Sequence, residues 1–233
     1  MKRSKRYQSN VEKIDRESAV TLEEGVKLLK QNTSVKFDES VDVAIRLGVD
    51  PKKADQMVRG TVALPHGTGK SIKVLVLCKA PKDKEAKEAG ADFIGLEEYI
   101  KKIEEGWSDV DAVVATPDVM KDVGKLGKYL GRKGLMPNPK AGTVTFEVKE
   151  AVQQLKAGRI EFRVDRHGNV HAIVGKTSFS NEKLVENIKV LVDQILRLRP
   201  SSAKGQYLRN ISISSTMGPG IKLDRTTLIE TMR

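Results

Sequence analysis

The sequence contains a single cysteine, Cys78, among its 233 residues. One cysteine excludes a disulfide framework, and this usage fits a reducing compartment such as the cytoplasm. Long apolar runs are also missing, because none approaches the roughly 20 residues that span a bilayer. The basic start, MKRSKRYQSNVEK, has no apolar segment behind it, so we expect no secretory signal. We therefore expect a cytoplasmic protein with no membrane partner.

Clusters that carry out catalysis or hold a metal are missing as well. His167 and His171 form the one close histidine pair, and Cys78 lies far from them in the sequence. Adjacent residues on a helix point about 100° apart, so neighbouring carboxylates on a helix do not form acid–base pairs. Three such pairs lie on predicted helices: Glu23 with Glu24, Glu97 with Glu98, and Glu104 with Glu105. The sequence shows no nucleophile elbow or catalytic triad, and we expect no enzyme activity, metal or cofactor.

The segment His66–Ser71, HGTGKS, resembles the end of a phosphate-binding loop. The full motif requires glycine where Leu64 stands and a helix after the loop, whereas a strand is predicted here. We interpret the segment as a flexible crossing between two bodies, with Gly67 and Gly69 as hinge residues and Gly158 in the return crossing. Nucleotide binding at the strand ends of the middle region, as in an enzyme, remains the alternative.

Positive charge dominates the composition. Lys and Arg number 42 against 31 Asp and Glu, which gives a formal net charge of +11 and a pI near 9.6. With 39% hydrophobic and 31% charged residues, the composition is that of a folded globular protein. A cationic surplus of this size indicates a polyanionic partner, either nucleic acid or an anionic membrane surface.

The segment 123–146 combines five glycines, two prolines and five cations, and it contains no carboxylate. Glycine and proline at this density exclude a long regular helix and predict an extended loop. A cationic surface without internal neutralisation suits a polyanion, although a solvated loop rich in glycine and proline remains the alternative. The stretch GRKG at 131–134 resembles the loop of a KH domain, but the prolines that follow prevent the second helix. The five cations are Lys125, Lys128, Arg132, Lys133 and Lys140.

Periodicity in the two flanks of the chain predicts helices and half-buried strands. A capping box at Thr21–Glu24 starts a helix, and residues 41–47 alternate as a strand with one buried face. Two alternating runs at 160–164 and 170–174 surround a turn and predict a hairpin. Two further elements complete the flanks: a helix at 181–198 with Ser180 as its cap, and a strand at 211–214.

The middle of the chain alternates short apolar strands with helices, which indicates a parallel sheet covered on both faces. The predicted strands are 72–78, 91–94, 110–115 and 143–148, and the predicted helices are 83–89, 96–105 and 150–157. Residues 68–158 carry a net charge of +2, and the two flanks together carry +9. We predict an α+β domain formed by both chain ends, residues 1–67 plus 159–233, with an inserted Rossmann-like α/β domain at 68–158.

Two segments of the flanks have the composition of RNA contacts. Lys36 and Phe37 place a cation beside an aromatic ring just before a strand, and residues 212–218 place hydroxyls on one strand face and then a turn. Hydroxyls and backbone amides recognise phosphates and the ribose 2′-OH. The alternatives are that Phe37 is a core residue and that the serines belong to an ordinary exposed strand.

Several stretches resemble, in this order, those of the bacterial large-subunit ribosomal protein family called L-one, the protein of the mobile stalk. They are FDESVDVAIRLGVDPKKADQMVRGTVALPHGTGK, ATPDVM, GRKGLMPNPKAGTV, KAGRIEFR, HAIVGKTSF and SSTMGPG. The resemblance implies two domains joined by two crossings that act as a hinge, and binding instead of catalysis. It also implies binding to an rRNA helix of the large subunit, movement and release of exit-site tRNA, and repression through the protein's own operon mRNA.

Carried onto this sequence, the resemblance implies three groups of rRNA- and mRNA-binding residues: Lys36, Phe37 and Ser40; His171, Lys176 and Ser178; and Thr216, Met217 and Gly218. From charge alone, we expect the five cations of 123–146 to contact tRNA or other RNA. We expect a monomer when the protein is free. A repressor or RNA chaperone that acts outside the ribosome remains the alternative to a ribosomal component.

Overall fold

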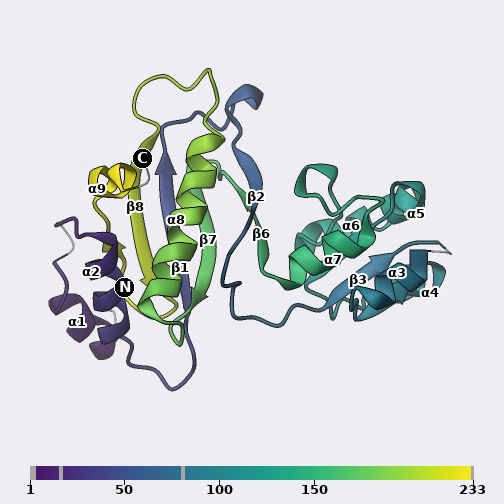
Figure 1. The fold of residues 1–233 in the computed structure, drawn as a ribbon, viewed down its shortest axis with the longest axis horizontal. Helices are drawn as coiled ribbons and strands as arrows, with labels where there is room; N and C mark the ends of the chain where they lie inside the picture. The colour runs from purple at the N-terminus through teal and green to yellow at the C-terminus, as the bar shows by residue number, and fades with distance from the viewer. Residues whose placement is uncertain (1–3, 16–17, 80–81, 232–233) are drawn as a thin grey trace. The chain divides into compact units, whose positions relative to one another are not determined.

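The chain forms two compact units, which Figure 1 shows as a ribbon. The computed structural model describes residues 4–15, 18–79 and 82–231. Unit 1 consists of Met1–Gly69 with Ile160–Arg233, and unit 2 of Lys70–Arg159. These divisions lie within two residues of the predicted boundaries 67/68 and 158/159. That each unit folds and moves as a domain stays a prediction.

Unit 1 is built on a four-stranded antiparallel sheet with the strand order β7-β1-β8-β9 (Figure 1). Strand β1 has a partner on each side, because Ala44 faces His171 of β7 and Ser212 of β8. The strands are β1 (Ser40–Leu47), β7 (Asn169–Lys176), β8 (Leu208–Ser215) and β9 (Ile221–Lys222). The strands predicted at 41–47 and 211–214 are confirmed.

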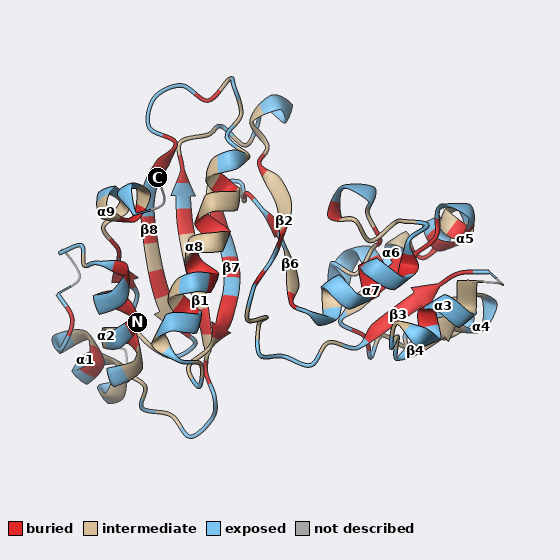
Figure 2. Cartoon of the chain, viewed as in Figure 1, coloured by how far each residue is buried: buried red, intermediate tan, exposed pale blue. Residues whose placement is uncertain are grey.

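Alternation along these strands places one face of the sheet in the core. Val41, Val43 and Ile45 of β1 are buried, and they belong to a single apolar cluster with the inner residues of the helices. Helices α2 (Leu22–Gln31), α8 (Asn181–Arg197) and α9 (Arg225–Glu230) contribute to this cluster. Figure 2 shows the buried residues running along the strands and the length of α8. On the opposite face of the sheet, His171 and Ile173 are exposed.

Local sequence signals set the starts of the helices in unit 1. Thr21 Oγ1 accepts a hydrogen bond from Glu24 N, and the Glu24 carboxylate accepts one from Thr21 N, so the predicted capping box is confirmed. Ser180 Oγ accepts from Lys183 N and starts α8, as predicted. Each cap stabilises its helix by about 1 kcal/mol. A helix that we did not predict, α1 (Lys5–Glu12), begins at Ser4 in the same way.

The predicted hairpin between 160–164 and 170–174 is wrong. The turn itself forms, because Asp165 N donates to Asn169 O at 2.7 Å. However, β6 (Arg159–Arg163) pairs with β2 (Arg59–Ala63) in a separate two-stranded sheet, whereas β7 pairs with β1. Turn chemistry is local, but a strand's partner depends on which distant segment offers a matching apolar face.

Unit 2 contains a three-stranded parallel sheet with the order β4-β3-β5, so the predicted parallel sheet is confirmed. Residues of β3 alternate between two cores: Val74 and Val76 pack with α3 and α7, and Leu75 and Leu77 pack with α4, α5 and α6. The elements are β3 (Val74–Leu77), α3 (Lys82–Glu88), β4 (Phe93–Gly95), α4 (Glu97–Glu104), β5 (Ala112–Ala115), α5 (Met120–Lys125), α6 (Gly127–Leu130) and α7 (Val148–Lys156). Short 3₁₀ turns add η2 (Pro117–Val119), η3 (Gly131–Lys133) and η4 (Pro139–Ala141) to unit 2, and η1 (Ala54–Gln56) lies in unit 1.

The predicted strand at 143–148 is wrong. The segment makes a single bridge, between Val144 and Ala115, and α7 already begins at Val148. Val148 and Val152 lie four residues apart on α7 and are both fully buried. Their helical spacing brings both side chains into the core, and this packing outweighs the short alternating pattern.

The segment 123–146 is not the extended loop that we predicted. Its first half is helical because Val123, Leu126 and Leu130 follow helical spacing and are buried in the core of unit 2. A Cβ added at Gly124 or Gly127 would meet no other atom within 4 Å, so these glycines lie away from the packing. The exclusion of a long regular helix is confirmed, because α5 has 6 residues and α6 has 4. The predicted extended loop is wrong, because the buried apolar stripe stabilises these short helices despite the glycines.

Leu126→Ala tests this helical packing. We expect the free energy of unfolding of unit 2 to fall by about 2–5 kcal/mol, because the substitution leaves a cavity at a fully buried position. Gly124→Ala is the matched control and should raise it by about 0.5–1 kcal/mol, as expected for an exposed helical glycine. Urea unfolding followed by fluorescence of Trp107, the single tryptophan, reports on the core that Leu126 shares. A negligible loss for Leu126→Ala would contradict the helical assignment.

Candidate nucleic-acid interface

Three chain segments converge where β1 begins and β7 and β8 end. Ser40 pairs with Lys176, and the next residue of β1 pairs with Ser215. Thr216 extends this pairing: its N donates to Ser40 O at 3.1 Å, and Ser40 N donates to Thr216 Oγ1 at 3.1 Å. Residues from all three predicted groups therefore meet at one end of the sheet. We call this surface the strand-end patch, and it comprises Lys36, Phe37, Ser40, Lys176, Ser178, Thr216, Met217 and Gly218.

One of the two cations of the strand-end patch, Lys176, is held in place by neutral oxygens. Lys176 Nζ donates to Ser40 Oγ at 2.9 Å and lies 3.5 Å from Asp38 O. Within the described residues, Lys176 forms no ion pair with a carboxylate. The ammonium is therefore positioned by uncharged oxygens, and the carboxylates of Asp38 and Asp42 interact with it at longer range.

The Asp38 carboxylate holds the loop after β7 by hydrogen bonds. Its carboxylate accepts hydrogen bonds from Ser178 Oγ at 2.8 Å, Ser178 N at 3.1 Å and Thr177 Oγ1 at 3.0 Å. Partial desolvation raises the pKa of Asp38, but the hydrogen bonds from Ser178 and Thr177 outweigh it, so the pKa lies below its ordinary value. Because the Ser178 hydroxyl donates to Asp38, it can offer only its lone pairs to a ligand.

The turn after β8 exposes a long apolar side chain beside backbone. Met217 is 45% exposed, and Gly218 N donates to Ser215 O at 3.1 Å. A Cβ at Gly218 would lie 2.4 Å from Ser215 Oγ, so a side chain there would displace a buried residue. The turn therefore depends on glycine at 218.

A hollow of about 420 Å³ beside this turn adds residues that the sequence analysis missed. Ser4, Arg6 and Tyr7 line it together with Thr216–Gly218. They belong to α1 and its cap, which the basic start of the sequence contains. The KRSKR cation cluster at residues 2–6 could have indicated that this segment contacts a polyanion. Periodicity, however, gave no reason to place the segment beside Met217.

The first segment presents its aromatic ring to solvent. Phe37 is 54% exposed and Lys36 is exposed in the loop before β1, so the alternative that Phe37 is a core residue is wrong. An exposed ring beside a cation can stack on a base while the cation meets the backbone.

His171 is predicted to be part of the site but lies elsewhere on the sheet. It faces Ala44 in the middle of β7, five residues from Lys176, which corresponds to roughly 17 Å along a strand. It is exposed on the open face of the sheet, and its Nε2 lies 3.9 Å from Asp165 Oδ2. The structure therefore separates His171 from the strand-end patch.

Asp42 lies on the same open face, between Ile173 and Ser214 of the neighbouring strands. Partial burial raises the pKa of Asp42 above its ordinary value, and the charges of His171 and Lys176 act in the opposite direction. Asp38 and Asp42 are thus two carboxylates of one segment whose surroundings shift their pKa values in opposite directions.

The five cations of 123–146 lie in unit 2 on short helices and turns. Lys125 pairs with Asp122 at 3.0 Å, so the segment is not free of neutralisation as its composition suggested. Lys133 Nζ donates to Ser108 Oγ, while Lys128, Arg132 and Lys140 are exposed.

The structure favours neither a metal centre nor a nucleophile. Among the described residues, no three His, Cys, Asp or Glu side chains gather as metal ligands would. Burial raises the pKa of the Cys78 thiol to about 12, so it stays protonated. No helix within the described ranges combines the length and apolar composition that crossing a bilayer requires.

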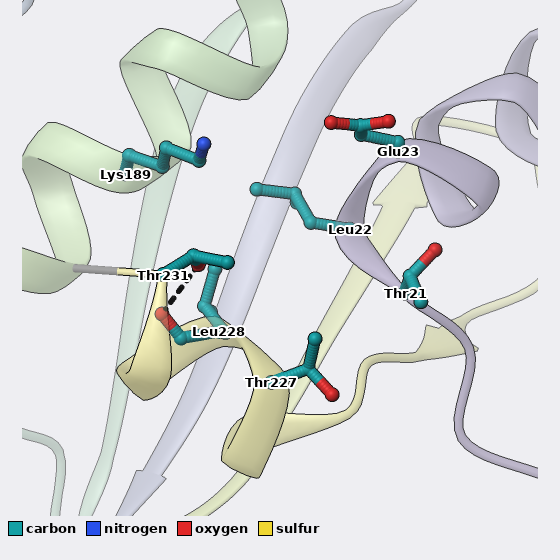
Figure 3. Close-up of a pocket in the computed structure, with 7 residues that line it drawn as sticks. All are labelled: Thr21, Leu22, Glu23, Lys189, Thr227, Leu228 and Thr231. Atoms are coloured by element: carbon teal, nitrogen blue, oxygen red, sulfur yellow. Dashed lines mark hydrogen bonds between the residues drawn. The ribbon is translucent and has the colours of Figure 1, made fainter. Parts of the chain in front are cut away.

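A hollow of about 250 Å³ lies where α2, α8 and α9 meet, as Figure 3 shows. A hydrogen bond of 2.9 Å from Thr231 Oγ1 to Leu228 O closes one side of it. The lining contains none of the predicted site residues: Thr21, Leu22, Glu23, Lys189, Thr227, Leu228 and Thr231. It lies between the start of α2, the middle of α8 and helix α9.

Comparison with known families decides the class of protein. The Ribosomal protein L1p/L10e family matches residues 28–219. The chain belongs to this family. Its members are ribosomal proteins of the large subunit that bind rRNA and are not enzymes, which confirms the resemblance and the expectation of no enzyme activity. The match spans every residue of the strand-end patch, but it does not include Ser4–Tyr7.

The opposite pKa shifts of Asp42 and Asp38 predict opposite effects on stability. A raised pKa means that ionised Asp42 costs stability above its folded pKa, so Asp42→Asn should increase the free energy of unfolding at pH 7. Asp38 has a lowered pKa, so its carboxylate contributes stability above its unfolded pKa and loses it as pH falls through the folded pKa. Asp38→Asn should therefore destabilise at pH 7.

Urea unfolding at pH 7 and pH 3 measures both effects. Both differences from the unsubstituted protein should shrink at pH 3, below the ordinary aspartate pKa of roughly 4. Asp42 is then largely protonated in both states, and Asp38 is largely protonated in the unfolded state while the pH approaches its lowered folded-state pKa. If both substitutions changed the free energy of unfolding at pH 7 in the same direction, the opposite pKa shifts of Asp38 and Asp42 would be contradicted.

Proposed function

We propose that the strand-end patch grips a helical segment of large-subunit rRNA at the base of the mobile stalk. The observation that supports this most is the convergence of Ser40, Lys176 and Thr216, which backbone pairing brings together from three distant parts of the sequence. Family membership supports rRNA as the ligand.

The patch is organised before RNA arrives. Hydrogen bonds join Thr216 to Ser40, including one between their backbones and one from Ser40 N to Thr216 Oγ1, and Ser40 Oγ orients Lys176. A preorganised surface loses less conformational entropy on binding, so more of the contact energy appears as affinity. Lys176 and Lys36 supply phosphate contacts, and Phe37 and Met217 supply apolar contact with bases or ribose.

We propose two further RNA partners on the ribosome. Lys128, Arg132 and Lys140 form an exposed positive surface that suits the backbone of exit-site tRNA. The protein's own operon mRNA would bind the strand-end patch, because a preformed surface recognises any RNA that presents the same shape. Competition between the rRNA fragment and the mRNA leader for the purified protein separates a shared site from two sites.

We propose that the two crossings act as a hinge in a monomer. Gly67, Gly69 and Gly158 all have positive φ, of 65°, 72° and 101°. Gly67 is a fixed point, however, because Asn187 Nδ2 donates to Gly67 O at 3.0 Å. The pivot of the first crossing therefore lies after residue 67. One constant distance between labels in the two units, in single-molecule measurements, would count against the hinge.

Phe37→Ala tests the proposed patch. We expect binding of a stalk rRNA fragment to weaken by roughly 5- to 150-fold, which corresponds to the loss of one base–aromatic stack. Phe146→Ala is the matched control, because Phe146 is 58% exposed but belongs to unit 2. Filter binding with both variants measures the difference. Equal affinities for the two variants would remove Phe37 from the site.

A further inference from the structure

Gly69, the residue of the first crossing at which unit 1 ends, lies directly against Lys176 of the strand-end patch. Gly69 has a φ of +72°, and a Cβ added there would lie 2.8 Å from Lys176 Cγ and 2.9 Å from Phe179 Cε1. Carbon atoms at these separations overlap, so a side chain at 69 would force one of the two neighbours to move.

Phe179 packs against the apolar core of unit 1. Its ring lies over Gly175, where an added Cβ would be 3.0 Å from the ring and 2.9 Å from Leu184 Cδ2. The backbone of Phe179 is also fixed, because its N donates to Lys176 O at 3.1 Å and its O accepts from Lys30 Nζ. Of the two neighbours of residue 69, we therefore expect the aliphatic stem of Lys176 to be displaced, because the Phe179 ring packs on the core and its backbone is hydrogen-bonded.

The crossing cannot move aside either. Asn187 is fully buried on α8, and it holds the chain just before Gly69 through His66 N at 3.2 Å and Gly67 O at 3.0 Å. Its Nδ2 also donates to Val174 O at 2.7 Å, which ties the crossing to β7. The aliphatic stem of Lys176 thus lies between the crossing, which Asn187 holds by hydrogen bonds, and the Phe179 ring, which packs on the core.

This enclosure determines where the ammonium of Lys176 points. The Cγ atom of Lys176 lies beside Gly69, and the far end of the side chain places Nζ 2.9 Å from Ser40 Oγ, inside the strand-end patch. A new Cβ at residue 69 would push Cγ, and Nζ would leave Ser40. The patch would lose a phosphate contact although no RNA-facing residue had changed.

We propose that Gly69 is a positioning residue of the RNA site. The missing side chain lets the crossing lie against Lys176 and aim its ammonium into the strand-end patch. The inference rests on the proposed function of that patch. Because binding linkage is reciprocal, RNA that holds Lys176 also stabilises the observed path of the chain into unit 2, and a different path lowers RNA affinity.

Gly69→Ala is the direct test, with Gly205→Ala as its matched control. Gly205 also belongs to unit 1 and has a φ of +74°, but a Cβ there would meet nothing within 4 Å. The two substitutions impose the same backbone strain, and only the first displaces Lys176. We expect Gly69→Ala to weaken binding of the stalk rRNA fragment by roughly tenfold and to reduce the salt slope of log K by about 1, as for a lost lysine–phosphate contact. Gly205→Ala should change neither quantity.

A double-mutant cycle with Lys176→Gln shows whether the two residues act through one contact. If they do, the combined variant binds no more weakly than Lys176→Gln alone. Unchanged affinity for Lys176→Gln would refute the proposed role of Lys176 in the patch. Weakened binding for Lys176→Gln together with equal affinities for Gly69→Ala and Gly205→Ala would refute the role of Gly69 alone.

Thermal denaturation keeps the inference testable if Gly69→Ala folds poorly. Lys176→Ala removes the Cγ atom that a new Cβ would meet. The destabilisation caused by Gly69→Ala should therefore be smaller in the Lys176→Ala background than in the unsubstituted protein. An equal loss of Tm in both backgrounds would place the strain elsewhere and overturn the proposal.

Discussion

The pairing of β1 with strands on both of its sides is the constraint on which the strand-end patch, the proposed RNA site, depends. β7 and β8 lie far from β1 in the sequence, and both run antiparallel to it. Their ends therefore meet its beginning, and Ser40 becomes the neighbour of both Lys176 and Thr216. Thr216 continues the ladder for one more step, so the turn that follows starts from a backbone that is already hydrogen-bonded. The patch is thus a consequence of strand register, and a slip of one residue would turn its side chains to the other face.

The same strand ends also touch the path by which the chain leaves unit 1. Asn187 is buried on α8 and hydrogen-bonds both the crossing and β7. Lys176 is the last residue of β7, and its stem lies at Gly69. The strand-end patch and the chain path into unit 2 are therefore in contact at Lys176 and Gly69. This contact gives a physical reason for glycine in the segment His66–Ser71, which resembles a phosphate-binding loop in sequence only.

Much of the fold could be predicted because its signals are local. The Thr21 capping box, the Ser180 cap and the alternation along 41–47 each depend on residues within one turn or one strand. The failures share a cause. The turn at Asp165–Asn169 was correct while its hairpin was not, and the glycines of 123–146 concealed a helical stripe whose stability comes from a core assembled by other segments. For the site, residue types suggested Phe37 and the turn at 216–218, but no pattern linked them to Arg6 and Tyr7.

The sequence by itself determined the protein class, the cationic character, the two kinds of sheet and the family, because composition, periodicity and motif order are properties of the chain. Only the tertiary structure decided which residues form one surface. It joined Ser40, Lys176 and Thr216, left His171 about five residues away along its strand, and placed α1 beside Met217. The physical reason is that strand partners and packing neighbours are chosen by burial of matching apolar faces, and this choice involves segments more than a hundred residues apart in the sequence.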